Sequence, residues 1–123
     1  MVNPESMIAS VKSHCRALSD HDKEAWLALW AEDAVLEDPV GRDVFRGRKS
    51  LAEEFWASIE KLSPMKLWLE RDVVVCKNEA VALLAGVVTQ NGKLHRVGPT
   101  LIDHFVFDEA GKIVSMRAFW KYE

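Results

Sequence analysis

The sequence predicts an α+β domain in which three N-terminal helices pack on a strongly curved, mostly antiparallel sheet. Apolar residues recur at helical spacing up to Leu62. After Ser63-Pro64 the spacing changes to two, and turn signals such as Asn91-Gly92 follow. Residues 1–123, of which 49% are apolar, suffice for a single domain with one core. A bent sheet covered by helices would enclose a conical cavity able to hold an apolar ligand.

The first helix begins with Asn3 as N-cap and Pro4 at the first helical position. His14 falls on its apolar stripe, so its side chain is expected to point inward. The simpler explanation is a core histidine satisfied by a backbone carbonyl. The stripe itself comprises Met7, Ile8, Val11, Cys15 and Leu18.

Two further helices are expected before residue 63. The second begins after Asp22 and ends near Glu32-Asp33. The third runs from about Arg48 to Lys61, and residues 42–46 form a short strand or loop ahead of it. Their apolar positions are Ala25, Trp26, Leu29 and Trp30 in the second helix, and Leu51, Phe55, Ile59 and Leu62 in the third.

Four strands are expected in the second half, over residues 65–76, 80–89, 93–107 and 112–121. Gly98-Pro99 interrupts the third of them. Proline cannot donate to a sheet ladder, so we expect a bulge or strong bend there.

Composition excludes several classes of protein. The formal net charge is −3 and the charges are interspersed, which argues against a nucleic-acid partner. Cys15 and Cys76 lack paired spacing, so reduced thiols are expected rather than a disulfide or a metal site. The N-terminus resembles no signal peptide and no apolar run reaches transmembrane length, so we expect a cytoplasmic protein without membrane contact.

Asp38 is the first candidate for chemistry. It follows the apolar residues 34–36 and Glu37, and Pro39 holds it extended. Successive side chains of an extended segment point to opposite faces, so Asp38 shares a face with Leu36. Asp38 is therefore either a general base in an apolar pocket or, more simply, one of two acids in a solvated edge loop.

Asp103 is the second candidate. Period two places it on the face of Leu101, Phe105 and Phe107. Burial there would raise its pKa and make it a hydrogen-bond donor. The alternative is an outward-facing Asp103, or one paired with Arg117 on the next strand.

Two carboxyl groups in different environments can have different pKa values, so that one acts as a base and the other as an acid. Asp38 would abstract a proton next to a carbonyl, and protonated Asp103 would stabilise the enolate oxygen. The sequence shows no Ser/His/Asp arrangement, phosphate-binding glycine loop or metal cluster that would compete with this chemistry.

Residues 29–41 (LWAEDAVLEDPVG) and 102–120 (IDHFVFDEAGKIVSMRAFW) resemble bacterial ketosteroid isomerase, a branch of the SnoaL-like, nuclear-transport-factor-like fold superfamily. The similarity covers nearly the whole chain. It implies a conical α+β fold, a homodimer formed through the sheet, and cofactor-free isomerisation of 3-oxo-Δ5-steroids. This family is itself the known example of a carboxylic acid kept neutral so that it can donate a hydrogen bond.

The resemblance assigns roles to individual residues. Asp38 matches the general base of the family and Asp103 its oxyanion-hole acid, while Trp120 and Met116 match residues lining the steroid cavity. We expect Phe55 and Phe105 to contact the substrate as well. One departure is that His14 occupies the position of the tyrosine that is the principal oxyanion donor, and Phe55 that of its supporting tyrosine.

Three functions remain open at this point. The first is a ketosteroid-isomerase-like enzyme in which Asp103 and His14 hold a dienolate oxygen. The second is other acid–base chemistry in the same cone, as in SnoaL-like polyketide cyclases, dehydratases and epoxide hydrolases, since histidine suits such work near neutral pH. The third is a non-catalytic domain that binds an apolar ligand, which five tryptophans permit but two buried acids oppose.

Overall fold

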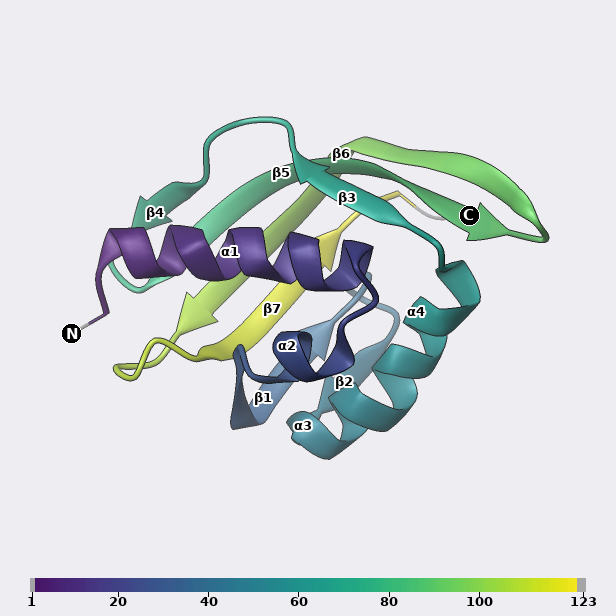
Figure 1. Cartoon of the computed structure of the whole chain (residues 1–123). Coiled ribbons are helices and arrows are strands. Elements are labelled where there is room, and N and C mark those ends of the chain that lie inside the picture. The colour runs from purple at the N-terminus through teal and green to yellow at the C-terminus, as the bar shows by residue number, and fades with distance from the viewer. Residues whose placement is uncertain (1, 122–123) are drawn as a thin grey trace.

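The computed structural model describes residues 2–121, apart from the side chain of Pro99. Three helical segments and one seven-stranded sheet confirm the α+β class. The helices are α1 (Pro4–Ser19), α2 (Lys23–Leu27) and a continuous third helix made of α3 (Gly47–Ser50), the π-helical η1 (Leu51–Phe55) and α4 (Trp56–Leu62). Figure 1 shows α1 lying across the bent sheet, with the other helices grouped at one end.

The sheet has the strand order β2-β1-β7-β6-β5-β3, and β4 also pairs with β5. Only the β1–β7 pair is parallel among the strand pairs of residues 2–121. The strands are β1 (Trp30–Glu37), β2 (Val44–Arg46), β3 (Lys66–Leu69), β4 (Val74–Cys76), β5 (Glu79–Gln90), β6 (Lys93–Phe107) and β7 (Ile113–Phe119).

The first helix follows its sequence pattern. Oδ1 of Asn3 accepts a hydrogen bond of 2.8 Å from the backbone N–H of Ser6, which satisfies one of the free amides at the helix start. His14 is only 1% exposed, so it faces inward as predicted. The buried residues around it on α1 are Met7, Val11, Cys15, Ala17 and Leu18.

Two predicted boundaries are wrong. The second helix ends at Leu27 rather than near Glu32-Asp33, and Trp30 begins β1 by pairing in parallel with Ile113. The expected single strand over 65–76 is split into β3 and β4 by residues 70–73. At the first place pairing with a distant strand decides the structure, and local apolar spacing does not report it. At the second, β3 and β4 both pair with β5, and residues 70–73 leave the sheet between them.

The β5–β6 hairpin is confirmed, including its irregularity. Asn91 and Gly92 form the two-residue turn, with φ values of 52° and 74°. The pairing register between β5 and β6 shifts at Gly98, which adopts φ +76°. As a result, the three residues 98–100 of β6 lie opposite the single residue Ala85 of β5. A Cβ on Gly98 would lie 2.5 Å from the carbonyl oxygen of Leu84, so a side chain does not fit here.

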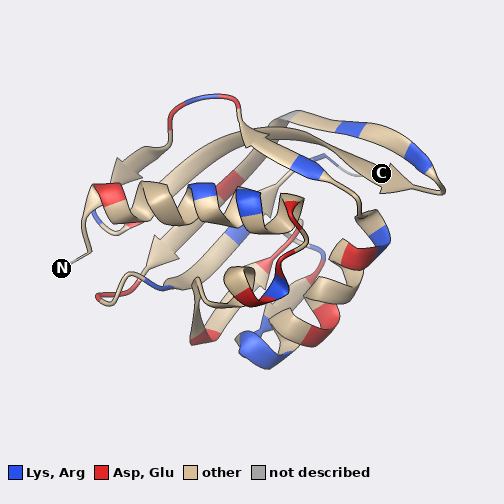
Figure 2. Cartoon of the chain, viewed as in Figure 1, with Lys and Arg blue, Asp and Glu red and all other residues tan. Residues whose placement is uncertain are grey.

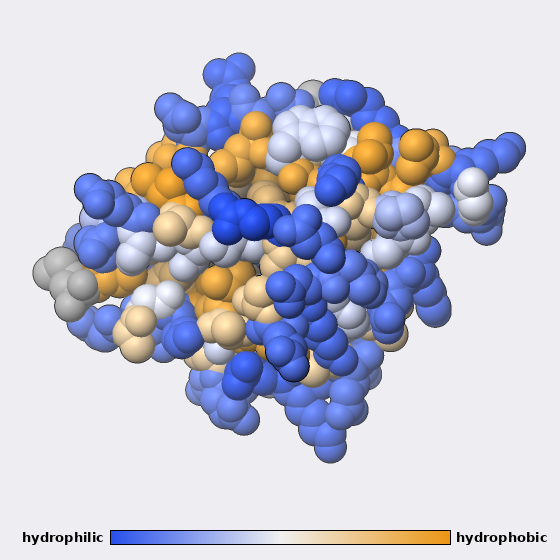
Figure 3. All heavy atoms as spheres, in the orientation of Figure 1, coloured by the Kyte–Doolittle hydropathy of each residue, from blue (hydrophilic) through white to orange (hydrophobic). Residues whose placement is uncertain are grey.

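The surface carries no uniform charge. Figure 2 shows acidic and basic segments interspersed along the helices and strands, as the sequence predicts. In Figure 3 the hydrophobic residues on the same face are interrupted by hydrophilic ones. Every helix within residues 2–121 is too short or too polar to cross a membrane.

Candidate active site

A cavity of about 400 Å³ lies inside the bent sheet, and the three polar residues singled out from the sequence all line it. Asp38 comes from the end of β1, Asp103 from the middle of β6 and His14 from α1. The apolar part of the wall is supplied by Leu18, Phe55, Ile59, Leu62, Met65, Leu67, Val88, Val97, Leu101, Met116 and Trp120. The structure therefore brings together three polar side chains of which the outermost two, His14 and Asp103, lie 89 positions apart (103 minus 14) in the sequence.

The backbone holds Asp38 in a fixed place at the end of β1. Its N–H donates to the carbonyl of Asp43 at 2.9 Å, and the N–H of Val40 donates to the carbonyl of Ala118 on β7, also at 2.9 Å. Leu36 is fully buried on the same face. The extended alternation thus directs Asp38 into the cavity as the sequence pattern indicates, and not into a solvated loop.

The surroundings of Asp38 change its acidity. Burial disfavours the charged carboxylate and raises its pKa to about 6, and the nearby Asp103 acts in the same direction. A hydrogen bond of 2.6 Å from Nε1 of Trp120 to Oδ1 of Asp38 opposes this rise. A carboxylate with a pKa near 6 is a stronger base than one in water and is still ionised at neutral pH.

Glu37 is directed away from the cavity. Its Oε2 accepts from the backbone N–H of Gly41 at 2.8 Å, and its Oε1 accepts from Nε of Arg117 at 3.0 Å. These two contacts, the Gly41 bond first, lower the pKa of Glu37. Neighbouring carboxyl groups therefore have opposite pKa shifts, because one lies in the cavity and the other is charged and hydrogen-bonded on the outer face.

Asp103 is 3% exposed and points into the core. It is flanked by two small residues, Ala82 on β5 and Ala118 on β7. Its Oδ2 lies 3.5 Å from Nε2 of His14. The alternative partner Arg117 is bound to Glu37 instead, so the inward placement holds and the ion pair with Arg117 does not form.

His14 is held from both sides of its ring. Nε1 of Trp26 donates a hydrogen bond of 3.0 Å to Nδ1, and Nε2 faces Asp103. The ring of Phe105 packs against the imidazole edge-on, with centroids 5.4 Å apart. His14 is thus a hydrogen-bonded histidine, but its partner is an indole on α2 and not the expected backbone carbonyl.

Three of the four residues expected to contact substrate line the cavity, namely Trp120, Met116 and Phe55. Phe105 does not. It is fully buried behind His14, so it supports the cavity wall instead of forming its surface. The alternation of side chains along a strand predicted the correct face of β6 for Phe105, but the sequence could not show that α1 covers it.

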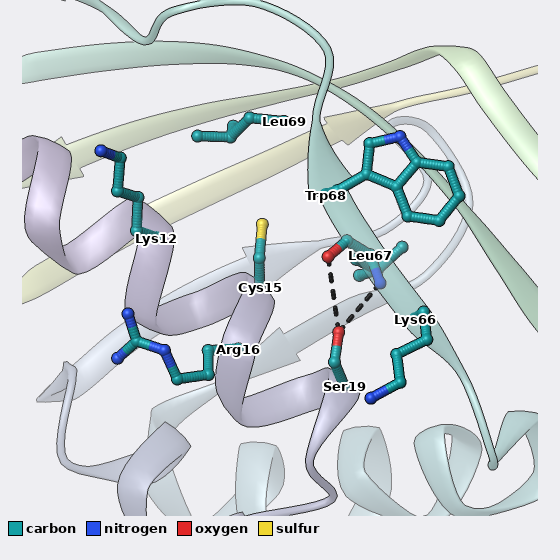
Figure 4. A pocket seen from close by; sticks show the side chains of 8 residues that line it. All are labelled: Lys12, Cys15, Arg16, Ser19, Lys66, Leu67, Trp68 and Leu69. Atoms are coloured by element: carbon teal, nitrogen blue, oxygen red, sulfur yellow. Dashed lines mark hydrogen bonds between the residues drawn. The ribbon is translucent and has the colours of Figure 1, made fainter.

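A second hollow of about 480 Å³ lies outside the cavity, between α1 and β3 (Figure 4). Cys15 borders it, and Leu67 lines both hollows. Burial raises the pKa of the Cys15 thiol to about 12, and the nearby Asp103 adds to the rise, so Cys15 is no nucleophile. Within residues 2–121 no three His, Cys, Asp or Glu side chains are grouped to hold a metal ion.

Sequence reasoning missed the role of Trp26, which it placed only on an apolar helix face. A buried tryptophan N–H needs an acceptor, and this rule was the one signal that could have pointed to His14. It also missed polar residues of the cavity that come from the far half of the hairpin and the end of the chain: Gln90, Arg96, Thr100 and Lys121.

Comparison with known proteins identifies the family of this chain. Residues 11–116 match the family described as the SnoaL-like domain. The steroid Δ-isomerase of Nocardioides simplex is 38% identical over 112 residues, which cover 91% of this chain and 87% of that protein. The chain belongs to the SnoaL-like domain family.

Two solved structures of this fold are also similar. The Δ5-3-ketosteroid isomerase from Mycobacterium sp. matches with a TM-score of 0.79 and 26% identity, covering 94% of this chain and 93% of that one. SalBIII, an epoxide hydrolase/cyclase-like enzyme with a role in pyran ring formation in the polyether salinomycin, matches with a TM-score of 0.86 and 25% identity, covering 98% and 95%. These relatives support an isomerase-like or cyclase-like enzyme.

Proposed function

We propose that this protein is a cofactor-free isomerase that moves a C=C bond into conjugation in a 3-oxo-Δ5-steroid or a similar enolisable ketone. The observation that carries the proposal is the half-buried Asp38 carboxyl, with a pKa near 6, in one cavity with the buried His14–Asp103 pair. The 38% identity to a steroid Δ-isomerase supports the same reaction.

The proposed reaction is a proton transfer within one substrate molecule. Asp38 takes a proton from the carbon between the carbonyl and the double bond, and the electron pair of that C–H bond delocalises to the carbonyl oxygen. The protonated Asp38 then returns the proton to the far carbon of the original double bond. No net proton or electron is gained or lost, so the reaction itself needs no redox cofactor.

The negative charge that develops on the carbonyl oxygen needs donors in place before the reaction. We assign this role to Nε2–H of His14 and to the carboxyl group of Asp103, which donates a hydrogen bond only when it carries a proton. They lie 3.5 Å from each other and both line the cavity, so one oxygen could receive hydrogen bonds from the two. Preorganised donors of this kind are usually the largest single contribution to such catalysis.

The apolar wall suits a rigid hydrocarbon substrate. Trp120, Met116 and Phe55 line the cavity, whose volume of about 400 Å³ is within the range of roughly 300–1,000 Å³ for small-molecule sites. Steroid-like ketones are therefore the proposed substrate class.

The test is the appearance of the conjugated enone, followed by its ultraviolet absorbance, when a 3-oxo-Δ5-steroid is added. Wild type should convert the steroid. The turnover rate of Asp38→Asn should be at least 100-fold lower, in line with the roughly 10²–10⁴-fold effect of general-base catalysis. Glu37→Gln is the matched control, because its carboxyl faces Arg117 and not the cavity. Equal activity in wild type and Asp38→Asn would refute the mechanism.

One observation favours a second candidate, a cyclase, dehydratase or hydrolase acting on another small apolar substrate. The polar side chain that α1 contributes to the cavity is the buried imidazole of His14, and the fold is shared with SalBIII. His14→Tyr distinguishes the two candidates. A gain in steroid isomerisation supports the isomerase, while no gain together with turnover of another enolisable substrate by wild type supports the second candidate.

We also propose that the protein is a homodimer formed through the sheet. Ile102 pairs with Phe119 across β6 and β7 and with Leu83 across β5 and β6. Ile102 and Phe119 are 37% and 39% exposed on the outer face, and nearby Val81 is 42% exposed. Adjacent exposed apolar side chains on a sheet face are typical of a surface covered by a partner.

A further inference from the structure

The hydrogen bond between Trp26 and His14 constrains what the imidazole can do. Its two partners are buried, with Trp26 fully covered and His14 1% exposed, and the N–N distance is 3.0 Å. An indole nitrogen only donates, so Nδ1 of His14 must accept. The ring proton is then on Nε2, the nitrogen that faces Asp103.

The position of this proton limits the role of His14. A nitrogen that carries a proton in the ring can donate to a substrate oxygen, but it has no lone pair with which to take a proton from carbon. The only lone pair of the neutral ring is on Nδ1, where Trp26 occupies it. His14 is therefore arranged as a donor and leaves the role of base to Asp38.

Trp26 is itself held rigidly. Phe55 stacks on its ring, with centroids 5.1 Å apart and an angle of 20° between the planes. Trp30 and Trp56 contact it from other sides, at centroid distances of 5.1 and 5.6 Å. An indole fixed by three aromatic rings gives its N–H a fixed direction, which orients the imidazole that accepts from it.

We propose that Trp26 is a positioning residue that fixes both the orientation of the His14 ring and its protonation at Nε2. The effect on turnover rests on the proposed isomerase function, whereas the hydrogen bond and the tautomer can be measured without any substrate. Trp30 offers a matched control, since it belongs to the same aromatic cluster, is 2% exposed, and its Nε1 has no hydrogen-bond partner among the described residues.

The direct test is nitrogen NMR on uniformly ¹⁵N-labelled protein near neutral pH, with the His14 ring assigned through a His14→Phe variant. Wild type and Trp30→Phe should show a protonated Nε2, an unprotonated Nδ1, and a scalar coupling across the hydrogen bond between Nδ1 and the Trp26 indole nitrogen. Trp26→Phe should lose the coupling and shift the Nδ1 resonance. A protonated Nδ1 or an absent coupling in the wild type would overturn the inference.

Steady-state kinetics give a second, independent test of the role of Trp26. In Trp26→Phe we expect kcat for enone formation to fall about fivefold to tenfold with KM nearly unchanged, since one hydrogen bond of ordinary strength is lost. Trp30→Phe should stay within about twofold of wild type. Equal losses of kcat in the two variants would mean that the cluster acts only by packing. If wild type shows the NMR signature but no isomerisation, the proposed function fails and the positioning role of Trp26 stands.

Discussion

The indole N–H of Trp120 donates a hydrogen bond of 2.6 Å to Oδ1 of Asp38. This contact joins the residue just after β7 to the residue just after β1, two strands that run parallel and side by side. The bond stabilises the carboxylate, while burial and the nearby Asp103 destabilise it. The basicity of Asp38 is thus set by opposing effects, each of which can be changed separately.

The first prediction concerns the pH dependence of the wild type. Asp38 acts as a base only when ionised, and its pKa is about 6. We expect kcat/KM for enone formation to decrease about tenfold per pH unit below this value and to be level above it. Steady-state rates between pH 4.5 and 8 measure this. A profile that is level from pH 5 to 7, or that falls as pH rises through this range, contradicts the assignment.

The second prediction is that Trp120→Phe moves this inflection to higher pH. The lost hydrogen bond had lowered the pKa of Asp38, so its removal makes the carboxyl more basic. The same pH–rate series measures the shift. Trp68→Phe is a suitable control, because Trp68 is about equally exposed (39% against 38%) but borders the outer hollow. An unchanged inflection in Trp120→Phe would show that the bond has no effect on the base.

The third prediction is that Asp38→Asn is inactive yet more stable than wild type at neutral pH. The pKa of Asp38 is raised from 3.8 to about 6 on folding, so the folded state binds the proton more tightly than the unfolded state. Wild-type stability should therefore decrease as pH rises from about 4 to about 6. The variant has no carboxyl group to ionise at this position, so its stability does not decrease in this way. Its Tm should exceed that of wild type by about 2 to 6 °C at pH 7.5.

Circular dichroism melts at pH 4 and pH 7.5 test the third prediction, since the advantage of the variant should be absent at the lower pH. Glu37→Gln is the informative control because the pKa shift of Glu37 has the opposite sign. Removing that charge should reduce stability at neutral pH. The third prediction is wrong if Asp38→Asn melts below wild type at pH 7.5.

The fourth prediction is that His14→Phe lowers kcat by ~10²–10³, the usual cost of removing one donor to a developing oxyanion. The substitution also leaves the buried indole N–H of Trp26 without its acceptor, so a moderate loss of thermal stability should accompany it. Rates and melts on the same preparation separate the two effects. Wild-type kcat in a folded His14→Phe protein would exclude His14 from the reaction.

The fifth prediction is that Ile102→Glu converts a dimer into a monomer, because a charge would be placed in the proposed interface. Sedimentation equilibrium measures the mass of each species. Val74→Glu is the control, since Val74 is 65% exposed on the short strand β4. A wild-type protein that sediments as a monomer at high concentration would refute the homodimer.

Much of the fold could be predicted because local signals agreed with the tertiary structure. The Asn3 cap, the Asn91-Gly92 turn and the apolar stripe of α1 are each specified within a few residues. The failures occurred where distant strands decide the outcome. Trp30 fits a helical spacing, but pairing with Ile113 on β7 makes it the start of a strand. No pattern within a short segment carries that information.

The candidate site was predictable for a different reason. Asp103 lies in β6 and Asp38 directly follows β1 in extended backbone, and the residues two positions before and after each of them are apolar, so their inward direction follows from alternation. Which groups touch them does not follow, because the contacts with Trp120 and His14 cross between separate elements. The effect of these contacts on the pKa of Asp38 required the three-dimensional arrangement.

The bulge at Gly98 divides the β5–β6 hairpin into an inner half, which carries Asp103, and an outer half, which ends at the Asn91-Gly92 turn. On one side, the pairing of Asp103 with Ala82 and Ala118 keeps the acid at a constant depth. On the other, Gln90 on β5 and Arg96 and Val97 on β6 contribute part of the cavity wall. Residues gained, lost or exchanged in that outer half would change which molecules are admitted, while the register of the reacting groups stays the same. A substitution in the outer half would therefore alter the cavity wall and leave unchanged the strand register that positions Asp103.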